Sequence, residues 1–171
     1  MIRSWKGHTP KVHPEAFVSE FAYVVGDVEI GAGSSVWPGT VIRGDSGKVV
    51  IGRNTCIQDN STVHADGRGI VIGDNVVIAH NVLCHADRVG DGAALGNGAV
   101  VNGSSEIGEN SIIAAGAVVL DGAKVPPNTF MVGIPATAKG TVTEQQRERF
   151  RRTAEHYAEL AKTYKAEGGL E

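Results

Sequence analysis

The chain has 171 residues, with 16 Lys and Arg against 19 Asp and Glu, so its formal net charge at pH 7 is −3. This length predicts one domain with a sizeable core, and the weakly acidic balance excludes nucleic acid as the main partner. No apolar run reaches the ~18 residues that span a bilayer, and the first ten residues lack the apolar segment of a signal peptide. The two cysteines are not spaced as a CxxC motif. We therefore expect no membrane association and a cytoplasmic location.

A six-residue repeat dominates the chain: an aliphatic residue returns every sixth position, and a small or β-branched residue follows four places later. A period of six is too short for a helix pair and predicts a solenoid of stacked β coils, with the 23 glycines suited to its corners. The period breaks only after Ile42, Val63 and Cys84, and Cys84 itself lies at an inward position that predicts a core role. The 20 repeated positions are Val12, Val18, Val24, Ile30, Val36, Ile42, Ile51, Ile57, Val63, Ile72, Ile78, Cys84, Val89, Leu95, Val101, Ile107, Ile113, Val119, Val125 and Met131.

A helical pattern follows the last hexad and a turn region that contains proline and glycine. Thr141 or Thr143 can cap this helix, whose polar face, expected to be solvated, carries Arg147, Arg151, Arg152, Glu155 and Lys162. Its apolar stripe comprises Phe150, Ala154, Tyr157, Ala158, Ala161 and Tyr164. The predicted organisation is a lead-in over 1–11, a β solenoid over 12–136, a connector over 137–142, an amphipathic helix over 143–166 and a tail over 167–171.

Polar residues form a column along one edge of the predicted solenoid. Side chains three hexads apart should lie one above the other in adjacent coils, about 4.8 Å apart. The position after the buried aliphatic residue, taken every third hexad from Ile42, reads Arg43, His64, His85 and Asn102. His64 and His85 are therefore predicted neighbours, and two imidazoles about 5 Å apart can share a metal ion.

His80 lies outside this column, two residues after Ile78 and one coil above Asp59. It cannot reach the same ion within one chain, whereas a catalytic zinc-type site takes three protein ligands. We expect the partner subunit's His80 to complete the site formed by His64 and His85. A closed ring of such contacts around a three-sided prism predicts a homotrimer.

Three segments, SSVWPGTVIRGD (34–45), CIQDNSTVH (56–64) and IAHNVLCH (78–85), resemble the γ-class carbonic anhydrases. The resemblance covers roughly residues 10 to 165 and implies a left-handed parallel β-helix of hexapeptide repeats with a C-terminal α-helix. It implies that His64 and His85 bind the metal from one subunit and that His80 binds it from the adjacent one. The implied metal is Zn²⁺, with Fe²⁺ or Co²⁺ as alternatives.

The implied reaction is the reversible hydration of CO2 to bicarbonate. A divalent metal lowers the pKa of its bound water toward ~7 and so creates a hydroxide nucleophile at neutral pH. In this family the glutamine matching Gln58 hydrogen-bonds that hydroxide; the alternative role is that of a surface amide. Arg43, Asp45 and Asp59 match an ion-pair set between subunits, or form solvated pairs of small energy.

Two further positions are assigned less directly. Asn102 completes the column above His85 and would support the ligands from behind. Members with a short loop carry a tyrosine of the terminal helix near the site, and Tyr157 or Tyr164 would be that group; the alternative role for both is core packing.

The sequence departs from the best-studied members after His64, where the insert is only Asp66-Gly67-Arg68-Gly69. The long acidic loop that carries a glutamate proton shuttle is therefore missing, which defines a short-loop subtype lacking the acidic loop. Ser46 stands where another acid follows RGD, and Cys56 and Asn97 replace an asparagine and a methionine of the family. Since fast hydration requires proton transfer, these departures affect rate before binding.

Three other functions stay open. The GIPA segment at 133–136 also occurs in hexapeptide-repeat acyltransferases, which use acetyl-CoA and need one histidine base. A thioesterase acting on a CoA thioester would use the same metal ligands, and a metal-binding scaffold with little activity would explain the missing acidic loop. Carbonic anhydrase is preferred over the acyltransferase because it accounts for His64, His80 and His85 together.

Overall fold

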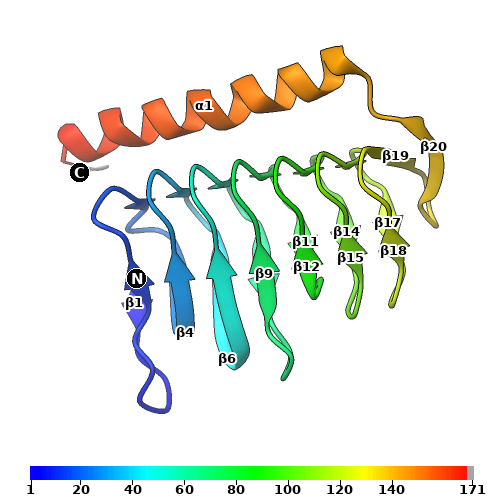
Figure 1. Cartoon of the computed structure of the whole chain (residues 1–171). Coiled ribbons are helices and arrows are strands. Elements are labelled where there is room, and N and C mark those ends of the chain that lie inside the picture. The colour runs from blue at the N-terminus through cyan, green and yellow to red at the C-terminus, as the bar shows by residue number, and fades with distance from the viewer. Residues whose placement is uncertain (169–171) are drawn as a thin grey trace.

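The computed structural model describes residues 1–168 and shows a triangular β solenoid with one helix along its length (Figure 1). Of the predicted tail, residues 169–171 lie outside the described residues. The elements are β1 (Ile2–Arg3), β2 (Lys11–Val12), β3 (Phe17–Val18), β4 (Tyr23–Ile30), β5 (Ser35–Val36), β6 (Val41–Ile51), β7 (Cys56–Ile57), β8 (Thr62–His64), β9 (Ile70–Ile72), β10 (Val77–Ile78), β11 (Leu83–Cys84), β12 (Arg88–Val89), β13 (Ala94–Leu95), β14 (Val100–Val101), β15 (Glu106–Ile107), β16 (Ile112–Ile113), β17 (Val118–Val119), β18 (Lys124–Val125), β19 (Thr129–Val132), β20 (Thr137–Thr141) and α1 (Glu144–Ala166).

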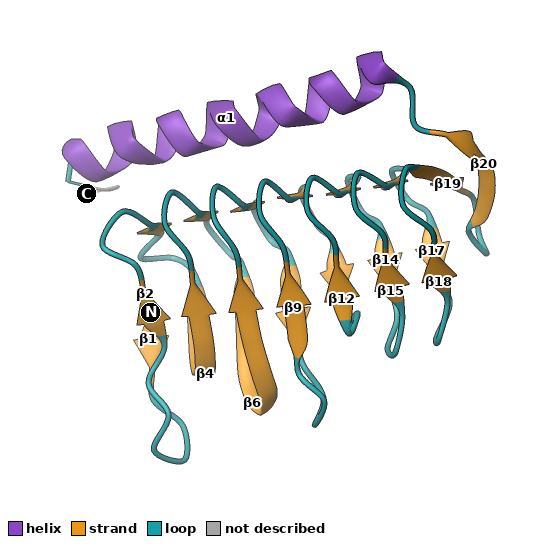
Figure 2. Cartoon of the chain, in the orientation of Figure 1, coloured by secondary structure: helices purple, strands orange, loops and turns teal. Residues whose placement is uncertain are grey.

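Each hexad supplies one short strand and one corner, so three hexads close one coil (Figure 2). β8, β11, β14 and β17 stack on the first side, and β9, β12, β15 and β18 stack on the second. The long strands β4 and β6 pass around the corner between these two sides. β3, β5, β7, β10, β13, β16 and β19 stack on the third side, where β20 pairs antiparallel with β19. The predicted left-handed parallel β-helix with a C-terminal helix is confirmed.

The interior of the solenoid is filled by the repeated aliphatic positions, as predicted. Ile42, Ile57, Ile78 and Leu95 are fully buried in one continuous cluster. Cys84 is equally buried in that cluster, which confirms its core role. Burying one such aliphatic side chain contributes about 1.5–3 kcal/mol, so the stacked hexads supply most of the drive to fold.

Hydroxyl side chains four places after the aliphatic residue join one coil to the next. The Ser34 hydroxyl donates to the Gly52 carbonyl (2.7 Å) and accepts from the Thr55 amide (2.9 Å). The Thr55 hydroxyl in turn donates to the Gly73 carbonyl (2.8 Å) and accepts from the Val76 amide (3.0 Å). Because a buried polar group is costly unless it is hydrogen-bonded, this ladder favours one register of stacking.

Asparagine shares the corners with glycine, which the sequence analysis did not anticipate. Gly39 and Asn60 both adopt positive φ, at 72° and 60°. They occupy adjacent coils, and the Asn60 side chain fills the space that a Cβ atom on Gly39 would need. Asparagine tolerates the left-handed region better than most residues with a side chain, so either residue can occupy this corner.

The helix α1 begins where one of the two predicted caps stands. The Thr143 hydroxyl accepts from the Gln146 amide, and the Gln146 side chain accepts from the Thr143 amide, so Thr143 and not Thr141 caps the helix. Ala154 and Ala161 of the predicted stripe are buried. They face the third side of the solenoid, where α1 contacts β3, β5, β7 and β10.

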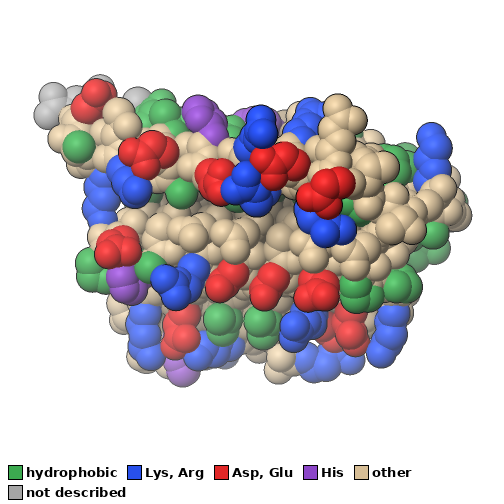
Figure 3. Space-filling view, turned by 45° about the horizontal axis from the view of Figure 1, so that its top comes forward, with side chains coloured by type: hydrophobic (Ala, Val, Ile, Leu, Met, Phe, Trp, Pro, Cys, Tyr) green, Lys and Arg blue, Asp and Glu red, His purple; other side chains and the backbone are tan. Residues whose placement is uncertain are grey.

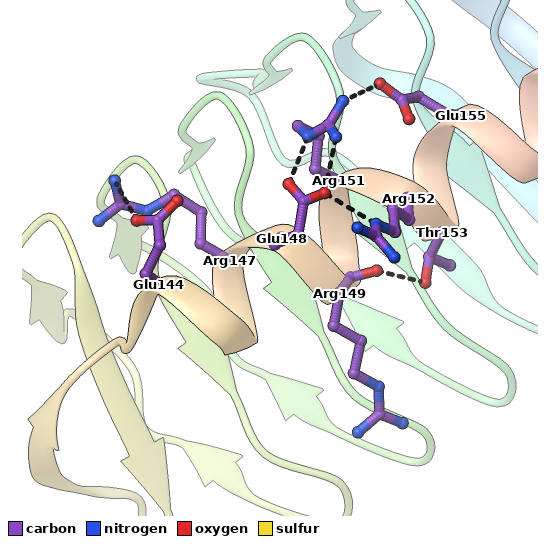
Figure 4. Close-up of polar contacts among 8 residues, drawn as sticks. All are labelled: Glu144, Arg147, Glu148, Arg149, Arg151, Arg152, Thr153 and Glu155. Atoms are coloured by element: carbon purple, nitrogen blue, oxygen red, sulfur yellow. Dashed lines mark hydrogen bonds and ion pairs between the residues drawn. The ribbon is translucent and has the colours of Figure 1, made fainter.

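The outer face of α1 carries alternating charges (Figure 3). Glu148 accepts from Arg151 and Arg152, each at 2.7 Å, and Glu155 pairs with Arg151 (Figure 4). The predicted solvated face is confirmed for its four exposed members, Arg151, Arg152, Glu155 and Lys162. Arg147 is instead half-buried, with a buried Nε atom, and its guanidinium donates to the Asn128 side chain (3.1 Å). Within residues 1–168 no helix combines the length and the apolarity that crossing a membrane would need.

Burial of both thiols yields a test of the core. Burial raises the pKa of Cys56 and of Cys84 to about 12, and neither forms a disulfide. Because only the thiolate reacts and both thiols are buried and protonated, Ellman's reagent at pH 8 should leave the folded protein unlabelled. In guanidinium chloride the reagent should count two thiols per chain. Rapid labelling of the folded protein at pH 8 would contradict this burial.

Candidate metal centre

The breaks in the six-residue period all fall at the corner between the first and second sides of the solenoid. At the first break, β6 continues without interruption through Val41–Ile51. At the second, residues 65–69 form a turn between β8 and β9. This corner departs from the six-residue repeat, although the neighbouring backbone still leaves no room for a side chain at Gly44 or Gly47. The last inward residue before each break is followed directly by a polar residue: Arg43, His64 and His85 in chain order.

The strand register brings these three residues into one column, as predicted. β6 pairs Arg43 with His64, and β8 pairs Val63 with Cys84, which sets His85 one coil beyond His64. The imidazole rings of His64 and His85 are stacked, with centroids 5.0 Å apart and planes inclined by 10°. The side chains are 17% and 28% exposed, so both imidazoles are largely shielded from water.

Asp45 holds His64 in place. The Arg43 guanidinium donates to Asp45 Oδ2 (2.6 Å), and His64 Nε2 donates to Asp45 Oδ1 (3.1 Å). Burial alone would raise the pKa of the Asp45 carboxyl, but the hydrogen bonds from Arg43 and His64 outweigh it and hold the pKa below its usual range. The carboxylate is therefore charged at neutral pH and orients the imidazole, as acids behind metal-binding histidines do.

His85 carries the observation that best fits a metal. Its Nε2 atom is buried and has no hydrogen-bond partner within residues 1–168. The nearest acid is Asp66, whose Oδ1 lies 3.5 Å away. One ligand atom each from His64, Asp66 and His85 lies within 4.8 Å of the others. Two imidazoles and a carboxylate are donors that zinc takes at about 2.0–2.2 Å, so this corner fits a divalent metal.

His80 lies at a different corner, between the third and first sides, after β10. Its Nδ1 atom is 3.0 Å from Asp59 Oδ2, and the two side chains are 41% and 40% exposed. Asp59 lies one coil below His80, as the sequence predicts, because β7 pairs with β10 in register. The fold therefore separates His80 from the His64 and His85 corner within one chain.

Gln58 and Tyr157 lie near this His80 corner. Gln58 is 4% exposed and directs its amide toward the Cys56 sulfur (3.7 Å), so it is not a surface amide. The Tyr157 ring packs against Trp37, with centroids 5.2 Å apart. Burial, followed by the charges of Cys56 and Asp59, raises the pKa of the Tyr157 hydroxyl. This hydroxyl keeps its proton at neutral pH and can act as a hydrogen-bond donor.

Two predicted site residues are engaged elsewhere. Tyr164 packs between Phe17 and Trp37, with ring centroids at 5.8 and 5.1 Å, in an aromatic cluster beneath the end of α1. Asn102 follows His85 in the column, but its amide donates to the Val119 carbonyl (3.0 Å) and so bridges to the next coil. Neither contact brings a polar group to the stacked histidines.

Asp66 is not among the predicted site residues. In the sequence, the short insert after His64 indicates the loss of an acidic loop, whereas in the structure the turn directs this acid back toward His85. The available signal was the spacing His64-Ala65-Asp66 directly beside the column. An acid two residues after a ligand, in a turn that returns to the same edge, is a candidate partner for that ligand.

Comparison with known proteins places this solenoid in the hexapeptide-repeat class. The family described as "Bacterial transferase hexapeptide (six repeats)" matches residues 9–44 and 88–129. A crystal structure of a hexapeptide transferase family protein from Anaplasma phagocytophilum has a TM-score of 0.92 and 34% identity, covering 96% of this chain and 98% of that one.

Within that class the match is more specific. A carbonic anhydrase of Geobacillus kaustophilus (strain HTA426) is 39% identical over 167 residues, which cover 97% of this chain and 92% of that protein. Gamma carbonic anhydrase 1 of Arabidopsis thaliana mitochondria is 61% identical over 36 residues, but these cover only 21% of this chain and 13% of the plant protein. The chain belongs to the γ-class carbonic anhydrase family, as its sequence predicts.

The charged carboxylate of Asp45 gives a pH-dependent prediction. Asp45→Asn should lower the free energy of unfolding of the metal-free protein at pH 7 by about 1 kcal/mol, because Arg43 and His64 lose a charged partner. The folded pKa lies below the unfolded one, so this stabilisation is present above about pH 4 and is lost as the pH falls through the folded value.

Urea unfolding with a chelator, at pH 7 and at pH 3, measures this difference. The matched control is Asp121→Asn, which removes an exposed carboxylate without an ion pair within residues 1–168. A loss that stays the same at both pH values, or that the control reproduces, would count against the role of Asp45.

Proposed function

We propose that this protein catalyses the reversible hydration of CO2 to bicarbonate at a metal site shared between adjacent subunits of a homotrimer. The observation that carries the proposal is the stacked His64 and His85 pair, with its buried and unpartnered Nε2 atom. When bound, Zn²⁺, or Fe²⁺ or Co²⁺ in its place, supplies a nucleophile from water at neutral pH. Membership of the family supports this reaction.

The residues of the chain divide into ligands and supports. His64 and His85 hold the metal from one subunit, and the partner subunit's His80 holds it from the other. Asp45 fixes the orientation of His64, and Asp59 fixes that of His80. Carboxylates in these positions also raise the basicity of the imidazole ligand, which strengthens its binding to a cation.

A homotrimer follows from the separation of the two corners. One chain supplies two histidines at one corner and a third histidine, with its own acid, at another. When identical chains pair the first corner with the second, each contact repeats head to tail, and the contacts form a ring when the rotation between neighbours closes. Three copies match the three sides of the solenoid. The buried free thiols suit a reducing compartment, and we propose a cytoplasmic location.

Gln58 and Tyr157 would act on the substrate side of the His80 corner. The Gln58 amide is held in a buried position, where it can hydrogen-bond an oxygen of CO2 or bicarbonate. The Tyr157 hydroxyl retains its proton at neutral pH, so it can donate a hydrogen bond but cannot collect the proton that hydration releases. Arg43 acts indirectly, through the charge of Asp45.

A second candidate function is the hydrolysis of a thioester, which one feature favours. A pocket of about 280 Å³ lies under the start of α1. Its wall includes Ala79, the residue before His80, and Asn97, which occupies the position of His80 in the next coil. Ile112, Phe130 and Phe150 also line it. This space is far larger than CO2 requires and is apolar enough for a short acyl group.

Stopped-flow measurement of CO2 hydration tests the proposed function. Protein purified without oxygen and loaded separately with Zn²⁺ and Fe²⁺ should contain about one metal per chain and hydrate CO2, and His85→Ala should lose both metal and activity. His156→Ala, which removes an exposed histidine of α1, is the control and should retain both. Full metal loading with hydrolysis of an acyl-CoA thioester, and without hydration, would favour the second candidate.

Mixing of variants tests the shared site. His64→Ala chains and His80→Ala chains each lack a ligand at every site of their own homotrimer. A mixed trimer regains an intact site wherever the His64 of one chain faces the partner subunit's His80. After unfolding and refolding together, the mixture should recover a fraction of wild-type turnover. No recovery, with mixed trimers present by mass spectrometry, would contradict an intersubunit site.

A further inference from the structure

We propose that Asp66 is a third metal ligand within the same chain, so that one subunit can hold the divalent metal before the partner subunit's His80 completes the site. The proposal rests on the proposed function only in treating the His64 and His85 corner as a metal site. It adds a ligand that the sequence analysis did not assign, and an order of events in which metal capture precedes assembly.

The position of Asp66 is fixed by its turn. Residues 65–69 connect β8 to β9, and the Gly69 amide donates to the Asp66 carbonyl (2.7 Å), which closes the turn. On the neighbouring coil, Gly47 lies so close to this carbonyl that no side chain would fit there. The turn is thus held against β6, on the same edge as His64 and His85.

The chemistry of the three groups is that of a ligand set. Asp66 Oδ1 is 3.5 Å from His85 Nε2, which is too long for a good hydrogen bond, and this nitrogen has no partner within residues 1–168. The ligand atoms of His64, Asp66 and His85 all lie within 4.8 Å of one another. A dication at the centre would replace a missing hydrogen bond with coordination and would also neutralise the carboxylate. Two histidines with one carboxylate form a known type of zinc site.

Other acids near the column are already occupied. Asp45 accepts from Arg43 and His64. Asp87, one coil beyond Asp66, lies 3.2 Å from the guanidinium of Arg68. Arg68 belongs to the same turn as Asp66, so its pairing with Asp87 directs this cation away from the histidines. Asp66 has no ion pair to Lys or Arg among the described residues.

Exposure of Asp66 matters for the order of events. Its side chain is 68% exposed, whereas those of His64 and His85 are 17% and 28% exposed. Packing therefore fixes the orientation of the histidine rings. The exposed carboxylate can move toward an incoming ion, and it can dissociate from the ion when the partner subunit's His80 binds. A single chain can then concentrate the metal at the edge where its neighbour will dock.

Titration of Co²⁺ into His80→Ala protein tests the proposal, because this variant lacks the third histidine at every site in any oligomeric state. Visible absorption and calorimetry should show about one Co²⁺ per chain. His80→Ala/Asp66→Asn should bind at least about tenfold more weakly, since a direct ligand is lost. His80→Ala/Asp66→Glu, which keeps the carboxylate, should recover part of this loss. His80→Ala/His85→Ala should bind none.

The matched control is His80→Ala/Asp121→Asn, which removes an exposed carboxylate that lies outside the site and has no ion pair within residues 1–168, and it should leave the affinity of His80→Ala unchanged within about twofold. Circular dichroism confirms that each variant retains the fold. Equal affinities for the Asp66 and Asp121 variants would overturn the proposal, as would wild-type binding with none in His80→Ala; both results leave the shared site intact. Failure of the wild-type protein to bind any metal would instead overturn the proposed function.

Discussion

In-register pairing of each coil with the next is the constraint on which the rest of the structure depends. Parallel hydrogen bonds and the buried hydroxyl ladder of Ser34 and Thr55 prevent one coil from sliding along another. A slip by one residue would turn the inward aliphatic side chains outward and would break up the column of polar residues at the same time. The 5.0 Å spacing of the His64 and His85 rings is therefore the strand spacing itself, expressed in side chains.

The corner with the broken period shows how a repetitive fold acquires a specific site. The interior requires an aliphatic residue at every sixth position. Reactive side chains can therefore be added where inserted residues interrupt the repeat at a corner without displacing the aliphatic residues of the core. The insertions after Ile42 and Val63 do this in successive coils. They lengthen β6 and add the turn of Asp66, while Ile51 and Ile72 return to the interior in register. Stability and reactivity are thereby assigned to different residues of the same coil.

Much of the fold could be predicted from the sequence because the six-residue period of the solenoid and the helical period of α1 can both be read from short stretches of the chain. A period of six defines the core, and the pairing of coils then places His85 over His64 without any knowledge of side-chain packing. Gln58 was harder, because its burial depends on neighbours from other parts of the fold. Asp66 was harder still, since the direction of its side chain depends on a turn that packs against Gly47. The strand β20 in the predicted connector, and β1 in the predicted lead-in, arise from pairing partners that no local pattern reveals.

The helix α1 links the last coil of the solenoid to the first. A stack of coils that touch only their neighbours is an open chain of contacts, and its ends can fray independently. Here α1 runs back from the last coil along the third side to the first coil, so that the end of α1 lies at the same end of the solenoid as the N-terminus (Figure 1). Ala161 and Tyr164 pack there against Phe17 and Trp37. Unfolding of the first coil must therefore also detach α1, which is connected to the last coil. The helix thus couples the two ends of the solenoid, so that they do not unfold independently.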